Sequence, residues 1–402
     1  MKDAFIVDGI RTAIGNFAGS LAPVRADDLA AHVISELIKR NPNLPPDQID
    51  DVIMGCANQA GEDNRNIARM SSLLAGLSPL IPGETVNRLC ASGMSAVVHA
   101  SRAIRSGEGD IFLAGGIEHM TRGPWVISKT SAAFGRDAQM YDSSFGWRFI
   151  NPKMKNLYGV DGMGETAENL AEKYQISRED QDQFALHSQI KASSSQRDGI
   201  FAEEISPISI PQKKGEGILF QNDEFIKSDS SLEGLAKLKP AFRKEGGSVT
   251  AGNASGLNDG AAVNLIASSS AISSYQMTPL SRIVSSAVTG VEPRIMGIGP
   301  VTASQLALKR AGLTLEQMDI IEINEAFAVQ VLACTRALGL QDQDERINPL
   351  GGSIALGHPL GMTGARLLLT ASKQLQRTQK KYALVTMCIG VGQGYAVVLE
   401  KA

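Results

Sequence analysis

A lone cysteine in a polar turn that leads into small residues is the first candidate for chemistry in this chain. Residues 86 to 97 read VNRLCASGMSAV, so Cys90 comes directly before an expected helix. Backbone N–H groups at a helix start favour a thiolate, so we expect them to lower the pKa of Cys90. This lowering, or a neighbouring base, would make Cys90 a nucleophile. A small buried thiol is the alternative, and for an isolated cysteine it is the commoner case.

Two further reactive side chains stand in glycine-rich stretches. His358 lies in GGSIALGHPLGMTGAR, where the glycines let the backbone approach another group closely. Cys388 lies in VTMCIGVGQGYAVVLE, where glycines separate two apolar runs. A dinucleotide-binding loop opens a helix, whereas these glycines lead into an alternating strand. We therefore expect a hairpin that exposes Cys388 at its tip, where function and packing are equally good explanations for the thiol.

An internal repeat indicates how these residues come together. The segment LIKRNPNLPPDQIDDVIMG (37 to 55) has the same layout as ALKRAGLTLEQMDIIEIN (307 to 324), and CASGMSAVVHASRAI (90 to 104) matches HPLGMTGARLLLTAS (358 to 372). Aligning Gly93 with Gly361 places Cys90 opposite His358. Two similar halves that pack about a pseudo-twofold axis bring the two helix starts together, so we expect the thiol and the imidazole to share one pocket.

The repeat predicts an α/β fold in which two duplicated halves, layered as α-β-α-β-α, are related by a pseudo-twofold axis. We expect the first half at residues 1–122 and the second at 251–402. Residues 123–250 lack the repeat and carry most of the charge clusters, which predicts an inserted loop domain. Within it, GETAENLAEKYQIS predicts an amphipathic helix. The alternative for such an insertion is surface decoration.

Composition narrows the class of protein further. The 402 residues are 43% hydrophobic and 20% charged with a net charge of −3, which gives no bulk electrostatic reason to bind nucleic acid or an anionic membrane. The four cysteines are far apart, so we expect neither a metal site nor a disulfide framework. The start lacks the apolar run of a signal peptide, and no stretch of about 18 apolar residues follows. We therefore expect a cytoplasmic protein.

Five stretches resemble the signature blocks of the thiolases, the acyl-CoA acyltransferases: NRLCASGMSA, TAGNASGLNDGAA, INEAFA, GGSIALGHPLGMTGAR and MCIGVGQG. The resemblance covers nearly the whole chain and implies the thiolase fold. It implies that Cys90 carries the acyl group, that His358 activates Cys90, and that Cys388 moves the proton at the α-carbon. It also implies one oxyanion hole from His358 and a water held by Asn324, and a second from the backbone N–H groups of Cys90 and Gly390.

The resemblance further implies acyl-CoA and free CoA as substrates, no permanently bound cofactor, and a homodimer or homotetramer. The inserted loop domain would hold CoA, with Ser255 near the pantetheine and Met163 beside the acyl end. Five residues are implied to line the pantetheine tunnel: Phe242, Ala251, Met296, Ala326 and Phe327. Lys227 stands where some relatives have an arginine near the nucleotide, and a lysine attracts a phosphate as a point charge without bidentate geometry.

Within the family, IRTAIGNFAGSLAPVRADDLAA, GCANQAGEDNRNIARM and FGWRFINPKM most resemble the 3-oxoadipyl-CoA thiolases of aromatic-compound breakdown. This resemblance implies cleavage of 3-oxoadipyl-CoA by CoA to acetyl-CoA and succinyl-CoA. Acetoacetyl-specific thiolases often carry a histidine where this chain has Gly162, which favours a bulkier acyl chain. Arg65 and Arg148 are candidates for binding its terminal carboxylate, although a structural or interface role is equally good for either arginine.

Several alternatives stay open at this stage. Within the family, the chain could be an acetoacetyl-CoA thiolase or a broad 3-ketoacyl-CoA thiolase. A ketoacyl synthase shares the duplicated fold and the cysteine at a helix start, but it has no second cysteine in the place of Cys388. A non-catalytic acyl-CoA-binding scaffold would keep the glycine loops and need neither thiol.

Overall fold

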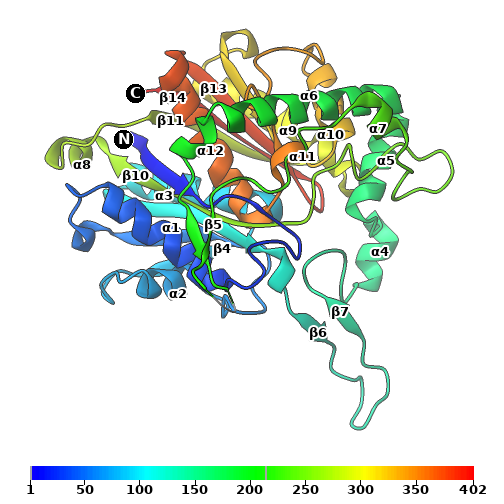
Figure 1. Cartoon of the computed structure of the whole chain (residues 1–402), viewed down its shortest axis with the longest axis horizontal. Coiled ribbons are helices and arrows are strands. Elements are labelled where there is room, and N and C mark those ends of the chain that lie inside the picture. Colours follow the sequence, from blue (N-terminus) through cyan, green and yellow to red (C-terminus); the bar gives the residue numbers. More distant parts are fainter. Residues whose placement is uncertain (1, 213–214) are drawn as a thin grey trace.

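The structure, a computed structural model, describes residues 2–212 and 215–402, and a ten-stranded sheet runs through it (Figure 1). Its strands are β1 (Ala4–Arg11), β2 (Gly15–Asn16), β3 (Asp51–Gly55), β4 (Gly83–Val86), β5 (Ile111–His119), β10 (Asn258–Ser268), β11 (Ser281–Gly290), β12 (Ile320–Ile323), β13 (Tyr382–Ile389) and β14 (Gln393–Lys401). Their order is β12-β13-β14-β11-β1-β10-β5-β3-β4, and β2 pairs with β10.

Two halves of the sheet repeat the same strand order. In the first half β1 pairs with β10 and β10 with β5, both antiparallel, and β5 pairs with β3 in parallel. In the second half β11, β14, β13 and β12 follow the same pattern. The halves join where β1 and β11 pair antiparallel. This arrangement confirms the predicted duplicated α/β fold.

The position of β10 differs from the expected division of the chain. Residues 251–402 were assigned to the second half, yet β10 lies between β1 and β5 in the first half of the sheet. In the first half β10 lies between β1 and β5, just as β14 lies between β11 and β13 in the second half. Because strand pairing assigns β10 to the first half, the structure favours a boundary after Ser268. With that shift, we keep the division into two halves and an inserted unit at 123–250 as a proposal.

Helices cover both faces of the sheet. They are α1 (Ala26–Arg40), α2 (Ile67–Leu74), α3 (Ser92–Ser106), α4 (Pro152–Tyr158), α5 (Met163–Tyr174), α6 (Arg178–Arg197), α7 (Leu232–Ala236), α8 (Ser269–Ser274), α9 (Gly299–Ala311), α10 (Ala328–Ala337), α11 (Ser353–Leu356) and α12 (Leu360–Thr378). Short 3-10 helices are η1 (Pro46–Gln48), η2 (Leu89–Ala91), η3 (Met120–Arg122), η4 (Ile200–Glu203), η5 (Pro293–Ile298) and η6 (Leu315–Gln317). Helices α3 and α9 each end at a glycine in the left-handed conformation, Gly107 and Gly312, as is typical of helix ends.

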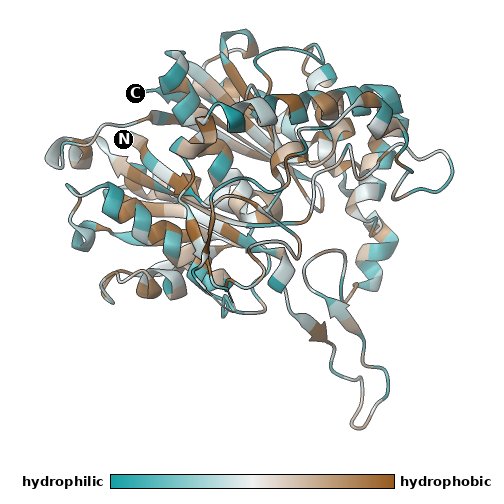
Figure 2. Cartoon of the chain, in the orientation of Figure 1, coloured by the Kyte–Doolittle hydropathy of each residue, from teal (hydrophilic) through white to brown (hydrophobic). Residues whose placement is uncertain are grey.

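The central layer consists of α3 and α12, which pack against each other and against β5. Helix α1, together with α2, covers the first half of the sheet, and α9 covers β11 and β14 of the second half. The core lies between these layers, and the central strands are predominantly hydrophobic (Figure 2). Every residue of β5 and β10 is buried, as expected for strands that are covered on both faces.

Glycines allow α3 and α12 to touch through their backbones. A Cβ placed on Gly93 would lie 2.4 Å from the carbonyl oxygen of Gly361, and one placed on Gly364 would lie 2.6 Å from the backbone nitrogen of Met94. Since Gly93 and Gly361 are the two positions that the repeat aligns, their contact confirms that alignment. The contact brings together the starts of two helices from different halves of the chain.

Residues 123–250 contain α4 to α7 and two small sheets, formed by β6 (Trp125–Ile127) with β7 (Met140–Asp142) and by β8 (Ile208–Ile210) with β9 (Ile218–Phe220). Helix α5 is the predicted amphipathic helix, and it buries Thr166 and Leu170. Helices α5 and α6 pack on α10, so this segment lies over the second half. The hairpin of β6 and β7 projects from the body of the molecule (Figure 1).

In the part of the chain that the structure describes, no helix has both the length and the apolar character needed to cross a membrane. Within the same residues, no three His, Cys, Asp or Glu side chains gather in a way that could hold a metal ion.

The backbone contacts around α12 predict a strong effect of one added methyl group. A Cβ at Gly116 of β5 would lie 1.9 Å from the carbonyl oxygen of Gly361. We expect Gly116→Ala to lower the free energy of unfolding by about 1 to 3 kcal/mol, because the backbone must shift to admit the methyl group. Gly290→Ala is the matched control, since its Cβ would meet nothing closer than 4.0 Å. Equal thermal midpoints for the two variants would contradict this packing.

Candidate active site

A strained turn holds Cys90 at the start of α3. Leu89 adopts a φ of 47°, a conformation that is rare for a residue with a branched side chain. Side chains fix the turn: Asn87 accepts a hydrogen bond from the N–H of Leu89, and Ser92 donates to the carbonyl of Leu89 at 2.6 Å. The backbone N–H groups of Gly390 and of Cys90 itself lie near the sulfur of Cys90, where both favour the thiolate. Two backbone donors are therefore close to the thiol.

The pKa of Cys90 is not lowered, and that expectation from the sequence is wrong. Burial of the thiol raises its pKa to about 11, and the nearby carboxylate of Glu118 adds to the rise. The hydrogen bonds from Gly390 and from Cys90 itself lower the pKa only in part. Donors at a helix start cannot offset the loss of water around a buried thiolate. Cys90 therefore needs a neighbouring base to become a nucleophile.

His358 lies just before α12, and its protonation state allows it to act as that base. Its Nδ1 is 2.8 Å from the hydroxyl oxygen of Thr363, and that hydroxyl donates its proton to the carbonyl of Pro359. Nδ1 must therefore carry a proton and donate to Thr363, which leaves a free lone pair on Nε2. Burial, with Arg366 nearby, lowers the pKa of His358 to about 3. The imidazole is neutral at physiological pH and can accept a proton at Nε2.

Asn324 follows β12 and faces the same imidazole. Its amide nitrogen lies 3.4 Å from Nε2 of His358, and its amide oxygen accepts a hydrogen bond of 2.7 Å from the hydroxyl of Ser353. The bond from Ser353 orients the amide so that its NH₂ group points toward His358. The structure thus brings together the two side chains that the sequence assigned to one oxyanion hole.

Cys388 does not lie at a hairpin tip, and that expectation is wrong. The residue belongs to β13, pairs with Gly394 of β14 and is buried. The tip comes three residues later, where Val391 is exposed with a φ of 64°. Burial raises the pKa of the Cys388 thiol well above its ordinary value, and the nearby sulfur of Cys90 contributes to the rise. The two thiols therefore lie near one another, with Cys388 buried and Cys90 partly exposed.

The two glycines of the tip have different tasks. Gly390 directs its N–H to Cys90, and a Cβ placed on it would lie 3.8 Å from the sulfur of Met163. Gly392 has a φ of 87° and packs against the carbonyl of Val291, so the turn itself requires a glycine there. Of these two glycines, Gly390 is the one that lies beside Cys90.

Most of the residues predicted to bind CoA form one connected surface. Ser255 donates to the carbonyl of Ala326 at 3.2 Å, and the ring of Phe327 meets that of Phe242 edge to face with centroids 6.2 Å apart. Phe242 also packs against α5 at Gly164, beside Met163. Phe242 and Met163 are exposed, so this surface is open to solvent at the end that leads to Gly390.

The other predicted residues lie apart from that surface or at its edge. Met296 is 3% exposed and packs in the core of the second half, while Ala251 is exposed. Lys227 is exposed with its ammonium group 5.2 Å above the ring of Phe225. Arg65 is exposed on a turn with a φ of 67°, and Arg148 is half-buried and donates to the carbonyl of Ser143 at 3.0 Å.

The site also contains residues that the sequence did not reveal. Glu118 accepts hydrogen bonds from the N–H groups of Ala57, Asn58 and Gly361, so it ties the first half to the start of α12. Burial raises the pKa of Glu118 to about 7. An acidic residue inside the apolar run IFLAGGIEH was a signal for it, because buried carboxylates are rare. No comparable signal marked Thr363, which is one of many small polar residues.

Comparison with known proteins identifies the family to which this fold and site belong. Residues 4–270 match the family described as Thiolase, N-terminal domain, and residues 277–401 match the family described as Thiolase, C-terminal domain. The chain therefore belongs to the thiolase family, as the sequence resemblance predicted.

Individual relatives match over the full length of the chain. A protein named "Beta-ketoadipyl-CoA thiolase" from Acinetobacter baylyi is 58% identical, with 100% of both chains covered. One named "3-oxoadipyl-CoA/3-oxo-5,6-dehydrosuberyl-CoA thiolase" from Escherichia coli is 56% identical, also with 100% of both covered. The crystal structure of human mitochondrial 3-ketoacyl-CoA thiolase in complex with CoA has a TM-score of 0.91 at 38% identity and covers 100% of this chain and 98% of that one.

The two opposite pKa shifts predict how the thiol reacts with pH. Since the pKa of Cys90 is raised and that of His358 is lowered, both groups stay neutral around pH 7. We expect alkylation of Cys90 by iodoacetamide, without substrate, to accelerate by about tenfold per pH unit between about pH 6 and pH 9. Peptide mass spectrometry follows the modified residue, and Cys388→Ala separates the two thiols. A rate that is already constant at pH 7 would indicate a thiolate–imidazolium pair and contradict the prediction.

Proposed function

We propose that this chain cleaves 3-oxoadipyl-CoA with CoA to give acetyl-CoA and succinyl-CoA through an acyl-cysteine intermediate. One observation carries the chemical part of the proposal: the buried thiol of Cys388 lies near the partly exposed thiol of Cys90, whose thiolate the N–H of Gly390 favours. Such a pair suits acyl transfer in which one thiol is a nucleophile and the other moves a proton. The names of the relatives that match the full chain support the choice of substrate.

In the first half-reaction, Nε2 of His358 takes the proton of the Cys90 thiol. The thiolate attacks the C3 carbonyl of the substrate, and a carbon–sulfur bond forms. The bond between C2 and C3 then breaks, and its electron pair moves to C2 as the enolate of acetyl-CoA. Cys388 donates its proton to C2, acetyl-CoA leaves, and the succinyl group remains on Cys90.

In the second half-reaction, the thiolate of Cys388 takes the proton of the CoA thiol. CoA attacks the thioester carbonyl on Cys90, and succinyl-CoA forms as the bond to Cys90 breaks. The imidazolium of His358 returns its proton to Cys90, so every group ends in its starting state. The low basicity of the buried imidazole favours this return.

Negative charge develops on an oxygen at two points of this sequence, and each point has preorganised donors. The N–H groups of Cys90 and Gly390 converge on the sulfur and can receive the oxyanion formed at the attacked carbonyl. The NH₂ group of Asn324, with His358 once it is protonated, faces the enolate oxygen directly or through a water. Removal of one such donor typically slows catalysis by about 100-fold or more.

The surface that runs from Ser255 over Phe327 and Phe242 to Met163 suits the pantetheine arm of CoA. It combines aromatic side chains with a few polar groups, as ligand clefts usually do. Lys227 stands exposed where a phosphate of the nucleotide would need a cation. Ala251, Ala326 and Met296 remain predicted neighbours of the tunnel.

Two features favour a long, charged acyl chain. A side chain at Gly162 would meet nothing within 4 Å of its Cβ, so the glycine leaves open space beside Met163. Arg148 follows Trp147, whose indole N–H donates to the carbonyl of Asp161 at 3.1 Å directly before that glycine. This bond ties the backbone before Arg148 to the segment before Gly162, and we therefore favour Arg148 over Arg65 as the partner of the terminal carboxylate.

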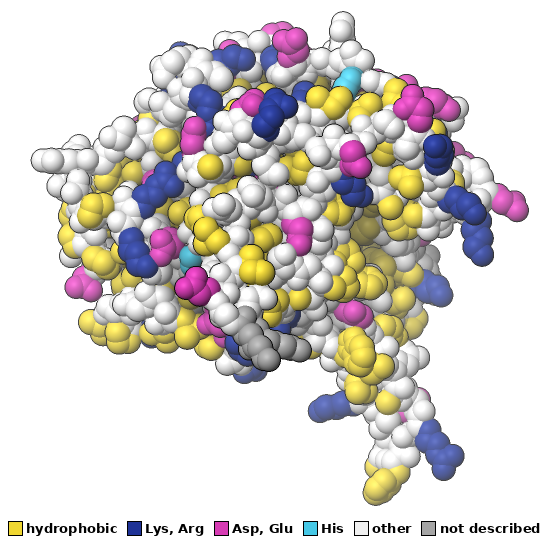
Figure 3. All heavy atoms as spheres, viewed as in Figure 1, with side chains coloured by type: hydrophobic (Ala, Val, Ile, Leu, Met, Phe, Trp, Pro, Cys, Tyr) yellow, Lys and Arg dark blue, Asp and Glu magenta, His cyan; other side chains and the backbone are white. Residues whose placement is uncertain are grey.

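We also propose that the enzyme acts in the cytoplasm as a homodimer or homotetramer. The projecting hairpin of β6 and β7 supports self-association, since Trp125 is 71% exposed and Ile127 and Met140 are exposed as well. Hydrophobic and cationic side chains gather on this projection (Figure 3). Exposed apolar surface of this kind is typical of an interface between proteins.

A comparison of two substrates tests the proposed function. We expect the chain to cleave 3-oxoadipyl-CoA with a kcat/KM at least about tenfold above that for 3-oxohexanoyl-CoA, which has the same chain length without the carboxylate. Loss of the enolate absorbance follows both reactions. Equal or better use of the uncharged substrate would contradict the 3-oxoadipyl assignment and favour a broad 3-ketoacyl-CoA thiolase.

Substitution of the arginine tests its part in this preference. We expect Arg148→Met to reduce the preference for 3-oxoadipyl-CoA by about tenfold or more, because an unpaired carboxylate in the pocket is unfavourable. Arg65→Met is the matched control and should keep the preference. A preference that survives Arg148→Met would contradict the role of Arg148, and one lost only in Arg65→Met would move that role to Arg65.

A further inference from the structure

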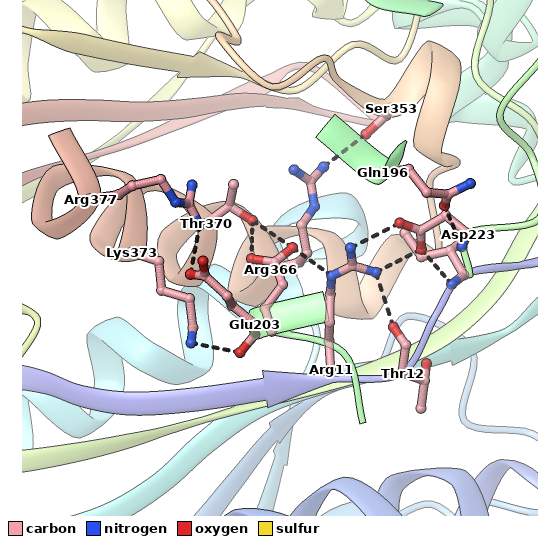
Figure 4. Close-up of polar contacts among 12 residues, drawn as sticks. Arg11, Thr12, Gln196, Glu203, Asp223, Ser353, Arg366, Thr370, Lys373 and Arg377 are labelled. Carbon is pink, nitrogen blue, oxygen red and sulfur yellow. Dashed lines mark hydrogen bonds and ion pairs between the residues drawn. The ribbon is translucent and has the colours of Figure 1, made fainter. Parts of the chain in front are cut away.

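A chain of buried polar side chains leads from Arg366 to His358, and the proposed reaction steps do not use most of it. Figure 4 shows the end of this chain at Arg366 and Ser353. Arg366 of α12 is 1% exposed, and its Nη2 donates to the hydroxyl oxygen of Ser353 at 3.3 Å. The hydroxyl of Ser353 donates in turn to the amide oxygen of Asn324 at 2.7 Å. The amide nitrogen of Asn324 then faces Nε2 of His358.

We propose that Ser353 and Arg366 are positioning residues that present the NH₂ group of Asn324 to the enolate oxygen. This inference rests on the proposed thiolase function and deepens it. The two residues touch neither the thiols nor the substrate. They act only through Asn324, and therefore on the step that makes or uses the enolate.

The direction of the hydrogen bonds carries this inference. A serine hydroxyl has one proton and accepts through its oxygen. The guanidinium of Arg366 can only donate, so it occupies the oxygen of Ser353 and leaves the hydroxyl proton for another acceptor. The acceptor is the amide oxygen of Asn324. An amide turned by 180° would direct its oxygen at the enolate and repel it, and the serine prevents that rotation.

Ser353 is the hydrogen-bond partner that the described residues offer to Arg366. Within those residues, Nε and Nη1 of Arg366 have no hydrogen-bond partner, and neither carboxylate oxygen of Glu322, a fully buried residue of β12, has one. Burial raises the pKa of Glu322 to about 8, while the charge of Arg366 opposes that rise. The guanidinium therefore directs its hydrogen bond at Ser353.

A buried ion-pair cluster lies near Arg366 (Figure 4). Arg11 of β1 binds Glu204 at 2.7 Å and Asp223 at 2.7 Å, and Thr370 of α12 donates to Glu204 at 3.0 Å. Glu204 and Asp223 belong to the segment 123–250. Their charges favour the charged form of Arg366, and Thr370 ties the helix that carries Arg366 to this cluster.

Two exchange reactions of the whole enzyme separate the proposed role from a structural one. Exchange of the acetyl-CoA methyl protons with deuterium oxide requires the enolate, whereas transfer of labelled CoA into an acyl-CoA requires only the thioester chemistry at Cys90. We expect Ser353→Ala to slow methyl exchange by about tenfold, the effect of one hydrogen bond to a polarised group, and to change CoA exchange by less than about twofold. Ser372→Ala is the matched control, since Ser372 is a buried serine on α12, the helix of Arg366, and its hydroxyl bonds to that of Ser281. It should change neither reaction.

A double-variant cycle tests whether Ser353 acts through Asn324. We expect Asn324→Ala combined with Ser353→Ala to exchange methyl protons as slowly as Asn324→Ala alone, because the serine has nothing left to orient. We expect Arg366→Met combined with Glu322→Gln, which removes the guanidinium and the buried carboxyl group together, to match Ser353→Ala in both exchange reactions.

Three results would overturn the inference. They are an equal loss of both exchange reactions in Ser353→Ala, effects of Ser353 and Asn324 that simply add, or an unchanged methyl exchange in Ser353→Ala. An unchanged methyl exchange in the charge-free pair would remove Arg366 from the proposal. Failure of the unaltered enzyme to catalyse either exchange would instead contradict the proposed thiolase function.

Discussion

The backbone contact between α3 and α12 is the constraint on which the rest of the structure depends. Gly93 and Gly361 let the two helices approach until the backbone of one fills the space of a side chain on the other. On the side of the sheet, Gly116 of β5 also leaves room for the backbone of Gly361, because it has no side chain. Because each helix comes from a different half of the chain, this contact places Cys90 and His358 at the same end of the central layer. A larger residue at any of these positions would separate the groups that must exchange a proton.

Burial of that central layer sets the chemistry of the site. Loss of water raises the pKa of Cys90 and lowers that of His358, so both groups are neutral at rest. In the mechanism that we propose, the thiolate forms at the moment of attack, when the proton moves to Nε2 of His358 and the charge passes to a carbonyl oxygen near the N–H groups of Cys90 and Gly390. Such neutral groups would protect the nucleophile until substrate is present.

The sequence predicted the features that follow from local pattern and repetition. The aligned repeats predicted the duplicated fold and the approach of the two helix starts, because similar segments fold alike and pack about an axis. It failed where the outcome depends on packing in three dimensions. The membership of β10 depends on strand order, the burial of Cys388 depends on the elements that cover its hairpin, and the pKa of Cys90 depends on desolvation. Ser353 and its hydrogen bonds carry no periodic signal at all.

One measurement tests most directly whether the pocket performs acyl transfer through Cys90. The enzyme is mixed with 3-oxoadipyl-CoA in the absence of free CoA, quenched in acid, digested and analysed by peptide mass spectrometry. We predict a succinyl group on Cys90 in the unaltered enzyme. We predict the same group on Cys90 in Cys388→Ala when that variant is supplied with succinyl-CoA. Cys90→Ser should carry no succinyl group, and its thermal midpoint should be unchanged. A succinyl group found on Cys388 or Cys56, or none on any residue while acetyl-CoA is released, would contradict the role of Cys90.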